Sequence, residues 1–211
     1  METSNGDGDA VDLNNFNSSK GLSGYNQPLN DTATAVWDLP VGHGRKFASG
    51  LSWPLEAVLG GWAFSGINTM TSGQPINLTY DPSAAFQVTT ANLVYRPNIL
   101  GDPLLPSDQR GAAQYFNKAN VLAPTSAAQP FGDAGRNIVA GFPYYNLDLG
   151  LHKQFPLWGE NKKLEFRTEF FNALNKTNFS PPSGDGSKAT FGTTTSTLPA
   201  RQVQFALKLM F

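Results

Sequence analysis

The sequence contains no cysteine and only two histidines, His43 and His152. The absence of cysteine excludes disulfides, thiolate metal sites and cysteine nucleophiles. The two histidines lie far apart, and neither has another metal-binding side chain at the spacing of a metal site. We therefore expect the chain to bind no metal and no other cofactor.

Charged residues are scarce as well, at 15% of the chain, whereas about 25% is typical of soluble domains. The net charge of −1 gives no electrostatic reason to expect nucleic acid as a partner. The sequence also lacks a run of about 18 apolar residues, which excludes a membrane-spanning helix. Aromatic residues, in contrast, reach 12%, and the mean hydropathy is −0.29. Few charges, many aromatics and modest hydropathy suit the wall of a β-barrel, in which polar and apolar residues alternate.

The last segment, residues 201–211, carries this alternation most clearly. One row is apolar and the other is mainly polar, which predicts a strand with two differently solvated faces. The apolar row contains Val203, Phe205, Leu207, Leu209 and Phe211, and the other row contains Gln202, Gln204, Ala206 and Lys208. An aromatic residue beside a free carboxylate is natural where lipid meets water. We therefore expect the segment to be the last strand of a transmembrane β-barrel.

Further strands precede this one. We predict an all-β fold, an antiparallel up-and-down meander of about five C-terminal barrel strands with long extracellular loops. The expected strands cover residues 31–40, 62–80, 144–155, 163–174 and 201–211. Residues 1–30 are expected to form an irregular loop, and residues 31–211 the barrel segment. Residues after Met1 lack the basic and apolar regions of a signal peptide, so we expect the chain to be the C-terminal part of a longer precursor.

The connections between these strands differ in length. Residues 81–141 and 175–200 form long connections, whereas the turn at residues 158–162 is short. Barrels commonly have long loops on the outside and short turns on the other side, so this alternation supports the barrel. In the connection between the first two strands, Trp53–Leu59 is expected to form a short helical turn, with Pro54 at its start and glycines after its end.

Charged side chains are expected on the inner face of the barrel. A lipid-facing arginine at the membrane midplane, for example Arg167, would cost about 2–4 kcal/mol. The lumen-facing candidates are Asp148, His152, Glu165, Arg167, Glu169 and Lys208. They either contact a solute or plug, or satisfy one another across neighbouring strands. Lys153 interrupts the outward row of its strand, where we expect its long side chain to reach the lipid headgroups.

Short motifs in a fixed order resemble the C-terminal barrel region of TonB-dependent outer-membrane receptors of the Oar-like type. They include Gly60-Gly61-Trp62, Ser72-Gly73-Gln74-Pro75, Phe131-Gly132-Asp133, Asn146-Leu147-Asp148, Phe170-Phe171-Asn172 and Arg201-Gln202-Val203-Gln204-Phe205. The resemblance implies a location in the bacterial outer membrane and energy-coupled uptake of a ligand by the parent protein. It implies contacts with lipid and with the rest of the barrel and its plug, and contacts with TonB and the barrel-assembly machinery through the parent.

The same resemblance implies that the end of the chain is the signal read during barrel assembly, carried by Phe205, Leu207, Leu209 and Phe211. It also implies that this chain alone transports nothing, because the plug and most of the wall are elsewhere.

Two other classes of protein remain as alternatives. A soluble β-rich carbohydrate-binding module would use exposed aromatic side chains to stack on sugars. A hydrolase would need a paired acid and base, and Glu165 and Glu169 lie about 13 Å apart along an ideal strand. This separation exceeds the roughly 6.5–9.5 Å of inverting glycosidases. We therefore expect no enzymatic activity.

Overall fold

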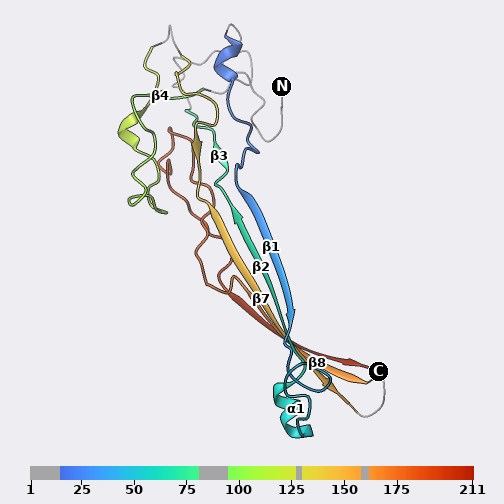
Figure 1. The fold of residues 1–211 in the computed structure, drawn as a ribbon. Coiled ribbons are helices and arrows are strands. Elements are labelled where there is room, and N and C mark those ends of the chain that lie inside the picture. The colour runs from blue at the N-terminus through green and yellow to red at the C-terminus, as the bar shows by residue number, and fades with distance from the viewer. Residues whose placement is uncertain (1–14, 81–94, 127–129, 158–161) are drawn as a thin grey trace. The chain divides into compact units, whose positions relative to one another are not determined.

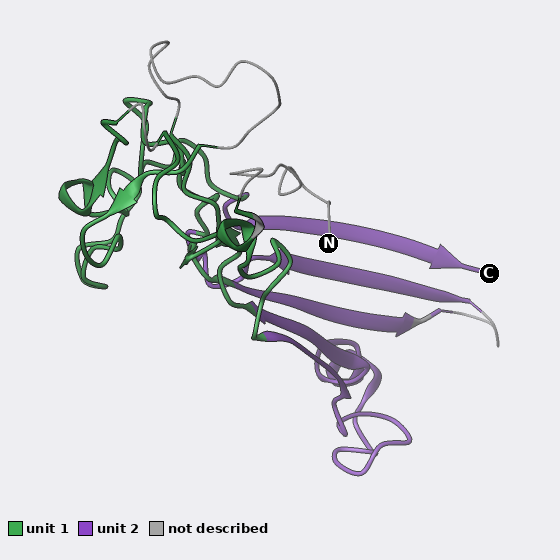
Figure 2. Cartoon of the chain, turned by 90° about the horizontal axis from the view of Figure 1, so that it is seen from above, with its two compact units in different colours: residues 1–29, 71–144, 178–198 green, residues 30–70, 145–177, 199–211 purple. Residues whose placement is uncertain are grey.

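The computed structural model describes residues 15–80, 95–126, 130–157 and 162–211. Two compact units are present (Figure 2). The strand unit comprises residues 30–70, 145–177 and 199–211, and the loop unit comprises the described residues within 1–29, 71–144 and 178–198. In the described part of the chain, no helix has the length and apolar content needed to cross a membrane.

The strand unit contains a five-stranded sheet (Figure 1). Its strands are arranged in the order in which they occur along the chain, when the short strands of the loop unit are left out. Its order is β1 (Asn30–Asp38), β2 (Trp62–Thr71), β7 (Tyr144–Pro156), β8 (Lys163–Phe171) and β9 (Gln202–Met210). Strands β7, β8 and β9 pair antiparallel. The predicted all-β antiparallel fold is therefore confirmed, although the short turn at residues 158–161 lies outside the described residues.

The register of β7, β8 and β9 keeps the two kinds of side chain on separate faces. Because side chains alternate along each strand, residues paired across strands share a face. The apolar face contains Leu149, Leu151, Phe155, Leu164, Phe166, Phe170, Val203, Phe205, Leu207 and Leu209. The polar face contains His152, Gln154, Glu165, Arg167, Glu169, Gln204 and Lys208.

The connection between β1 and β2 forms the predicted helical turn, α1 (Trp53–Leu59), with proline in its first turn. The Gly60 N–H donates to the Glu56 carbonyl at 2.9 Å and ends the helix. Gly61 then adopts a φ of 69°, and a Cβ there would lie 2.6 Å from the Gln154 carbonyl oxygen on β7. Glycine is therefore required where the chain turns from the helix into β2.

Strand β2 is shorter than predicted and ends at Thr71 instead of near residue 80. Ser72 turns away and donates its N–H to the Leu29 carbonyl at 2.9 Å. Gly73 packs so closely on the backbone of Gly141 that a side chain at position 73 would overlap it. The following β3 (Pro75–Ile76) pairs with β6 (Val139–Ala140) in a separate sheet. This backbone contact between distant segments ends the alternation of β2.

The loop unit has a hydrophobic core of its own, which the sequence analysis did not predict. Short elements supply its framework, namely η1 (Phe16–Ser19), β3, β6, β4 (Asn98–Ile99), η2 (Lys118–Asn120) and β5 (Val121–Leu122). The buried core consists of Ile76, Leu78, Tyr115, Phe116, Val121, Val139 and Phe191. The described parts of the long connections thus pack together, and their apolar residues come from segments far apart in the sequence.

Two aromatic residues organise this core. Phe116 is fully buried and stacks on Phe191 with ring centroids 5.2 Å apart. Burial raises the pKa of the Tyr115 hydroxyl, although the nearby Arg110 lowers it in part. The hydroxyl therefore keeps its proton and donates to the Ala140 carbonyl at 2.8 Å. This hydrogen bond ties the core to β6.

Replacing Phe116 by alanine is expected to destabilise the loop unit by about 3–5 kcal/mol, because a buried ring leaves a cavity. Hydrogen-exchange mass spectrometry of the full-length protein in detergent should show faster exchange in peptides that contain Val121 and Val139. Leu100→Ala is the matched control, because Leu100 is 69% exposed. Equal exchange in the two variants would contradict the assignment of Phe116 to a core.

Candidate functional site

The polar face of the sheet brings most of the predicted lumen-facing residues together. In the register of the strands, Glu165 of β8 lies opposite Gln154 of β7 and Lys208 of β9. Arg167, two positions along β8, lies opposite His152. The sheet therefore places a carboxylate, a guanidinium, an ammonium and an imidazole on adjacent positions of three strands.

The strongest contact in this cluster joins Arg167 and Glu165. The Nε of Arg167 donates to Oε1 of Glu165 within the same strand. Glu165 is 6% exposed, whereas the Arg167 side chain is 42% exposed. A buried carboxylate is costly unless it is paired, so Arg167 stabilises the charge of Glu165 while part of its side chain stays accessible.

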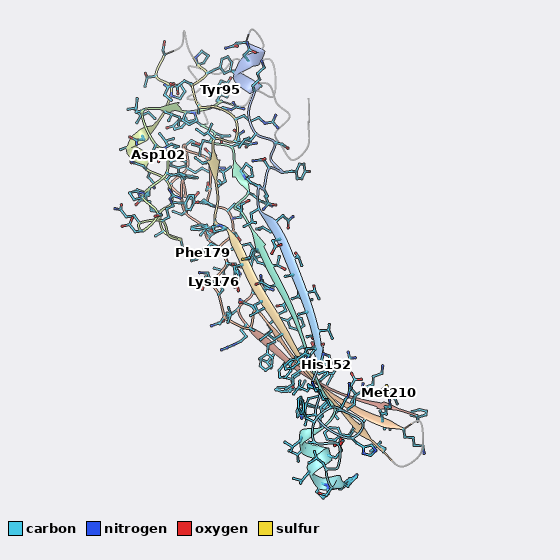
Figure 3. All side chains as sticks on the ribbon, in the orientation of Figure 1. Tyr95, Asp102, His152, Lys176, Phe179 and Met210 are labelled. Atoms are coloured by element: carbon cyan, nitrogen blue, oxygen red, sulfur yellow. The ribbon has the colours of Figure 1, made fainter. Side chains whose placement is uncertain are left out.

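His152 connects the cluster to a fourth strand. Its Nε2 lies 3.4 Å from Oγ of Ser65, which belongs to β2. Figure 3 labels His152 on the ribbon of the sheet. Ser65 was not among the predicted site residues. The alternation of β2 is the signal that could have found it, because Ser65 lies between Phe64 and Gly66, on the opposite face from these two residues.

Asp148 and Glu169 lie apart from the centre of the cluster. Glu169 is paired in register with Gly150 and Gln204. Asp148 accepts hydrogen bonds at 2.8 Å from the Asn146 side chain and from the Asn172 backbone N–H. Its carboxylate thus joins the ends of β7 and β8, which is a structural role.

Asn172 completes this junction. It adopts a φ of 51°, a conformation that asparagine tolerates better than most residues. Its side chain accepts from the Lys176 N–H and donates to the Lys176 carbonyl, both at 2.9 Å. Two of the quoted motifs, Asn146-Leu147-Asp148 and Phe170-Phe171-Asn172, therefore meet in space and close the ends of their strands.

Lys153 corrects one prediction. Its side chain does not extend to the membrane surface, because the residue is 1% exposed. The Nζ donates to the Gly60 carbonyl and lies 3.5 Å from the Glu56 carbonyl, at the end of α1. The ring centroids of Trp62 and Phe155 lie 5.2 and 5.1 Å from Nζ. Helix α1 therefore satisfies a cation on the apolar face of the sheet.

The loop unit contains a cavity of about 380 Å³. None of the described residues that line this cavity is charged, and the lining contains both amide or hydroxyl groups and aromatic rings. The lining consists of Gln27, Thr71, Ser72, Gln74, Phe142, Tyr144, Phe179, Ser180, Pro181 and Leu198. Phe142 and Phe179 contact each other with ring centroids 5.0 Å apart. Such a lining suits an uncharged ligand with both polar and apolar surface.

The proposed assembly residues lie on or directly after β9, the outer strand of the described sheet. Their exposed fractions are 67% for Phe205, 69% for Leu207, 55% for Leu209 and 92% for Phe211. Across residues 15–80, 95–126, 130–157 and 162–211, no three acidic or histidine side chains gather in a way that could hold a metal ion.

An antiparallel sheet with one charged face and one exposed apolar face is the architecture of an outer-membrane barrel wall. The sequence matches the outer membrane beta barrel domain family over residues 1–204, and the chain belongs to this family. No curated protein and no solved structure matches the chain. The protein is thus located in the outer membrane.

Arg167→Met should destabilise the protein by about 1–3 kcal/mol, because Glu165 then remains as an unpaired buried carboxylate. The double variant Arg167→Met/Glu165→Gln should recover part of this loss, because the charge is removed as well. Guanidinium unfolding of the refolded full-length protein, followed by tryptophan fluorescence, measures both. A double variant less stable than the single variant would contradict the pairing.

Lys153→Met should also cost about 1–3 kcal/mol, because the Gly60 carbonyl loses its donor in an apolar environment. Limited proteolysis within residues 39–61 should become faster in the full-length protein. Lys163→Met serves as the control, because Lys163 is exposed on the neighbouring strand. Unchanged proteolysis in Lys153→Met would show that the ammonium does not hold α1.

Proposed function

We propose that the chain is the C-terminal wall of a TonB-dependent outer-membrane receptor of the Oar-like type, which takes up a ligand. The observation that carries the proposal is the charged polar face opposite an apolar face on β7, β8 and β9. The short motifs, which occur in the same order as in Oar-like receptors, support this receptor type for the parent protein. Membership in an outer-membrane family argues against the alternative of a soluble carbohydrate-binding module.

The wall acts only as part of its parent. In the described sheet, β1 and β9 are the outer strands. An open edge in hydrocarbon leaves backbone N–H and C=O groups unpaired, at a cost of several kcal/mol for each group. Further strands of the parent therefore pair with β1 and β9, and the parent also supplies the plug and the segment that contacts TonB. The barrel-assembly machinery reads the apolar row of β9.

The two units have different parts in uptake. The loop unit holds the uncharged cavity of about 380 Å³ and makes the first contact with the ligand. The polar face then lines the path of the ligand and contacts the plug through Arg167, His152 and Lys208. In this proposal Glu165 has a structural role, because it accepts a hydrogen bond from Arg167.

Energy coupling is tested with the purified full-length parent and the C-terminal domain of TonB as the probe. We expect binding in detergent, measured by biolayer interferometry. Deletion of the parent gene and deletion of the TonB gene should then impair growth in the same nutrient-limited medium. If no TonB binding occurs, the receptor proposal fails.

The role of the polar face is tested by Arg167→Glu in the full-length parent. Charge reversal next to Glu165 should reproduce the growth defect of the deletion strain, while the amount of protein in the outer membrane stays unchanged. Arg45→Glu is the matched control, because Arg45 lies in the turn after β1 and outside the polar face. If the growth defect of Arg167→Glu is explained by a lower amount of the protein in the outer membrane, the cluster has only a structural role.

A further inference from the structure

A second cavity, of about 400 Å³, lies in the strand unit between α1 and the apolar face of the sheet. Its described lining is entirely apolar and comes from β2, β7, the end of α1 and the chain that follows β1. The lining residues are Leu39, Val41, Leu59, Trp62, Phe64 and Leu151. The polar face and the uncharged cavity of the loop unit contribute no residue to it.

This apolar cavity, called the groove below, lies beside a helix that is held in place by specific hydrogen bonds. Lys153 of β7 donates to the Gly60 carbonyl and so holds the end of α1 against the sheet. The indole N–H of Trp62 donates to the Val58 carbonyl at 2.8 Å, which fixes the helix to β2. Glu56 of α1 accepts from the His43 N–H at 2.9 Å. These three contacts fix the position of α1 relative to β2, β7 and the chain that follows β1.

The chemistry of the lining selects the occupant. The indole N–H of Trp62 is already bonded to Val58, so it is not free to bind a ligand in the groove. A polar ligand or a peptide backbone would lose hydrogen bonds to water without replacement, which costs roughly 1–3 kcal/mol for each group. A hydrocarbon chain loses nothing and fills the space. The occupant is therefore an alkyl chain.

Helix α1 itself has the character of a membrane-interface segment. Trp53 is 75% exposed, Leu55 is 51% exposed and Val58 is 64% exposed. Apolar side chains of this size on a short helix are favourable where the helix lies at the lipid surface, and tryptophan prefers that depth. The groove thus opens where lipid is the surrounding solvent.

The ends of the strands indicate the leaflet. Pro156 of β7, Lys163 of β8 and Met210 of β9 are paired at one end of the sheet, and only six residues separate Pro156 from Lys163 in the sequence. The Gln154 N–H donates to the Gly61 carbonyl, which places the α1 connection at this same end. Short turns of outer-membrane barrels face the periplasm. The periplasmic leaflet of an outer membrane consists of phospholipid. We propose that the groove beside α1 binds one acyl chain of a phospholipid from this leaflet.

The probe is phosphatidylethanolamine with a diazirine in one acyl chain, mixed into liposomes of phosphatidylethanolamine and phosphatidylglycerol that carry the full-length protein. After irradiation, mass spectrometry should locate cross-links on the peptide that contains Leu59 and Trp62. Leu151→Trp fills the groove and should lower this cross-linking by about tenfold, the effect of losing about 1.4 kcal/mol of binding.

Leu149→Trp is the matched control, because Leu149 lies on the same face of β7 but does not line the groove. It should leave the cross-linking unchanged. Both variants must show the heat-dependent gel mobility of the folded wild type. Equal cross-linking in Leu151→Trp and Leu149→Trp would overturn the proposal.

A second measurement needs no variant. Cross-linking of the wild type at the groove should saturate as the mole fraction of the probe rises, whereas cross-linking along the apolar row of β9 should rise linearly. Linear behaviour at both places would show ordinary lipid contact and overturn the proposal. Displacement of the probe by lipopolysaccharide, but not by unlabelled phosphatidylethanolamine, would overturn the assignment to phospholipid.

Discussion

The register of the sheet is the constraint on which the rest of the structure depends. In the proposed barrel wall each strand separates lipid from the lumen, so a shift of the pairing by one residue would exchange the two faces. Such a shift would place Arg167 in lipid, at a cost of about 2–4 kcal/mol near the midplane. The pairing of Glu165 with Lys208 and of His152 with Arg167 follows from the correct register. The charges therefore select the register as much as the apolar row does.

Two charged side chains are buried in this sheet, and each is satisfied by a different device. Glu165 lies on the polar face and is paired with Arg167 from its own strand. Lys153 lies on the apolar face and donates to the Gly60 carbonyl at the end of α1. The same helix covers Lys153 and contributes Leu59 to the lining of the apolar cavity in the strand unit.

Period-two alternation was sufficient to predict that these segments form antiparallel strands, and Pro54 with the following glycines was sufficient to predict α1. The alternation failed where a distant segment decides the structure. The packing of Gly73 on Gly141 ends β2 early, and the burial of Lys153 depends on α1. The hydrogen bond from Asn172 to Asp148 depends on a backbone conformation of Asn172 that the residue pattern does not reveal. The core of the loop unit was missed for the same reason, since its residues come from several segments without a shared period.

The two units carry different parts of the proposed receptor function. In the strand unit, the register of β7, β8 and β9 places apolar side chains on one face and the polar row on the other. The loop unit is held by the packing of Tyr115, Phe116 and Phe191, which all belong to that unit. Residues that line its cavity can therefore differ in size and polarity without changing the register of the wall. In the proposed receptor, ligand specificity is accordingly expected to depend on the loop unit and the plug, whereas the strand unit determines insertion and closure.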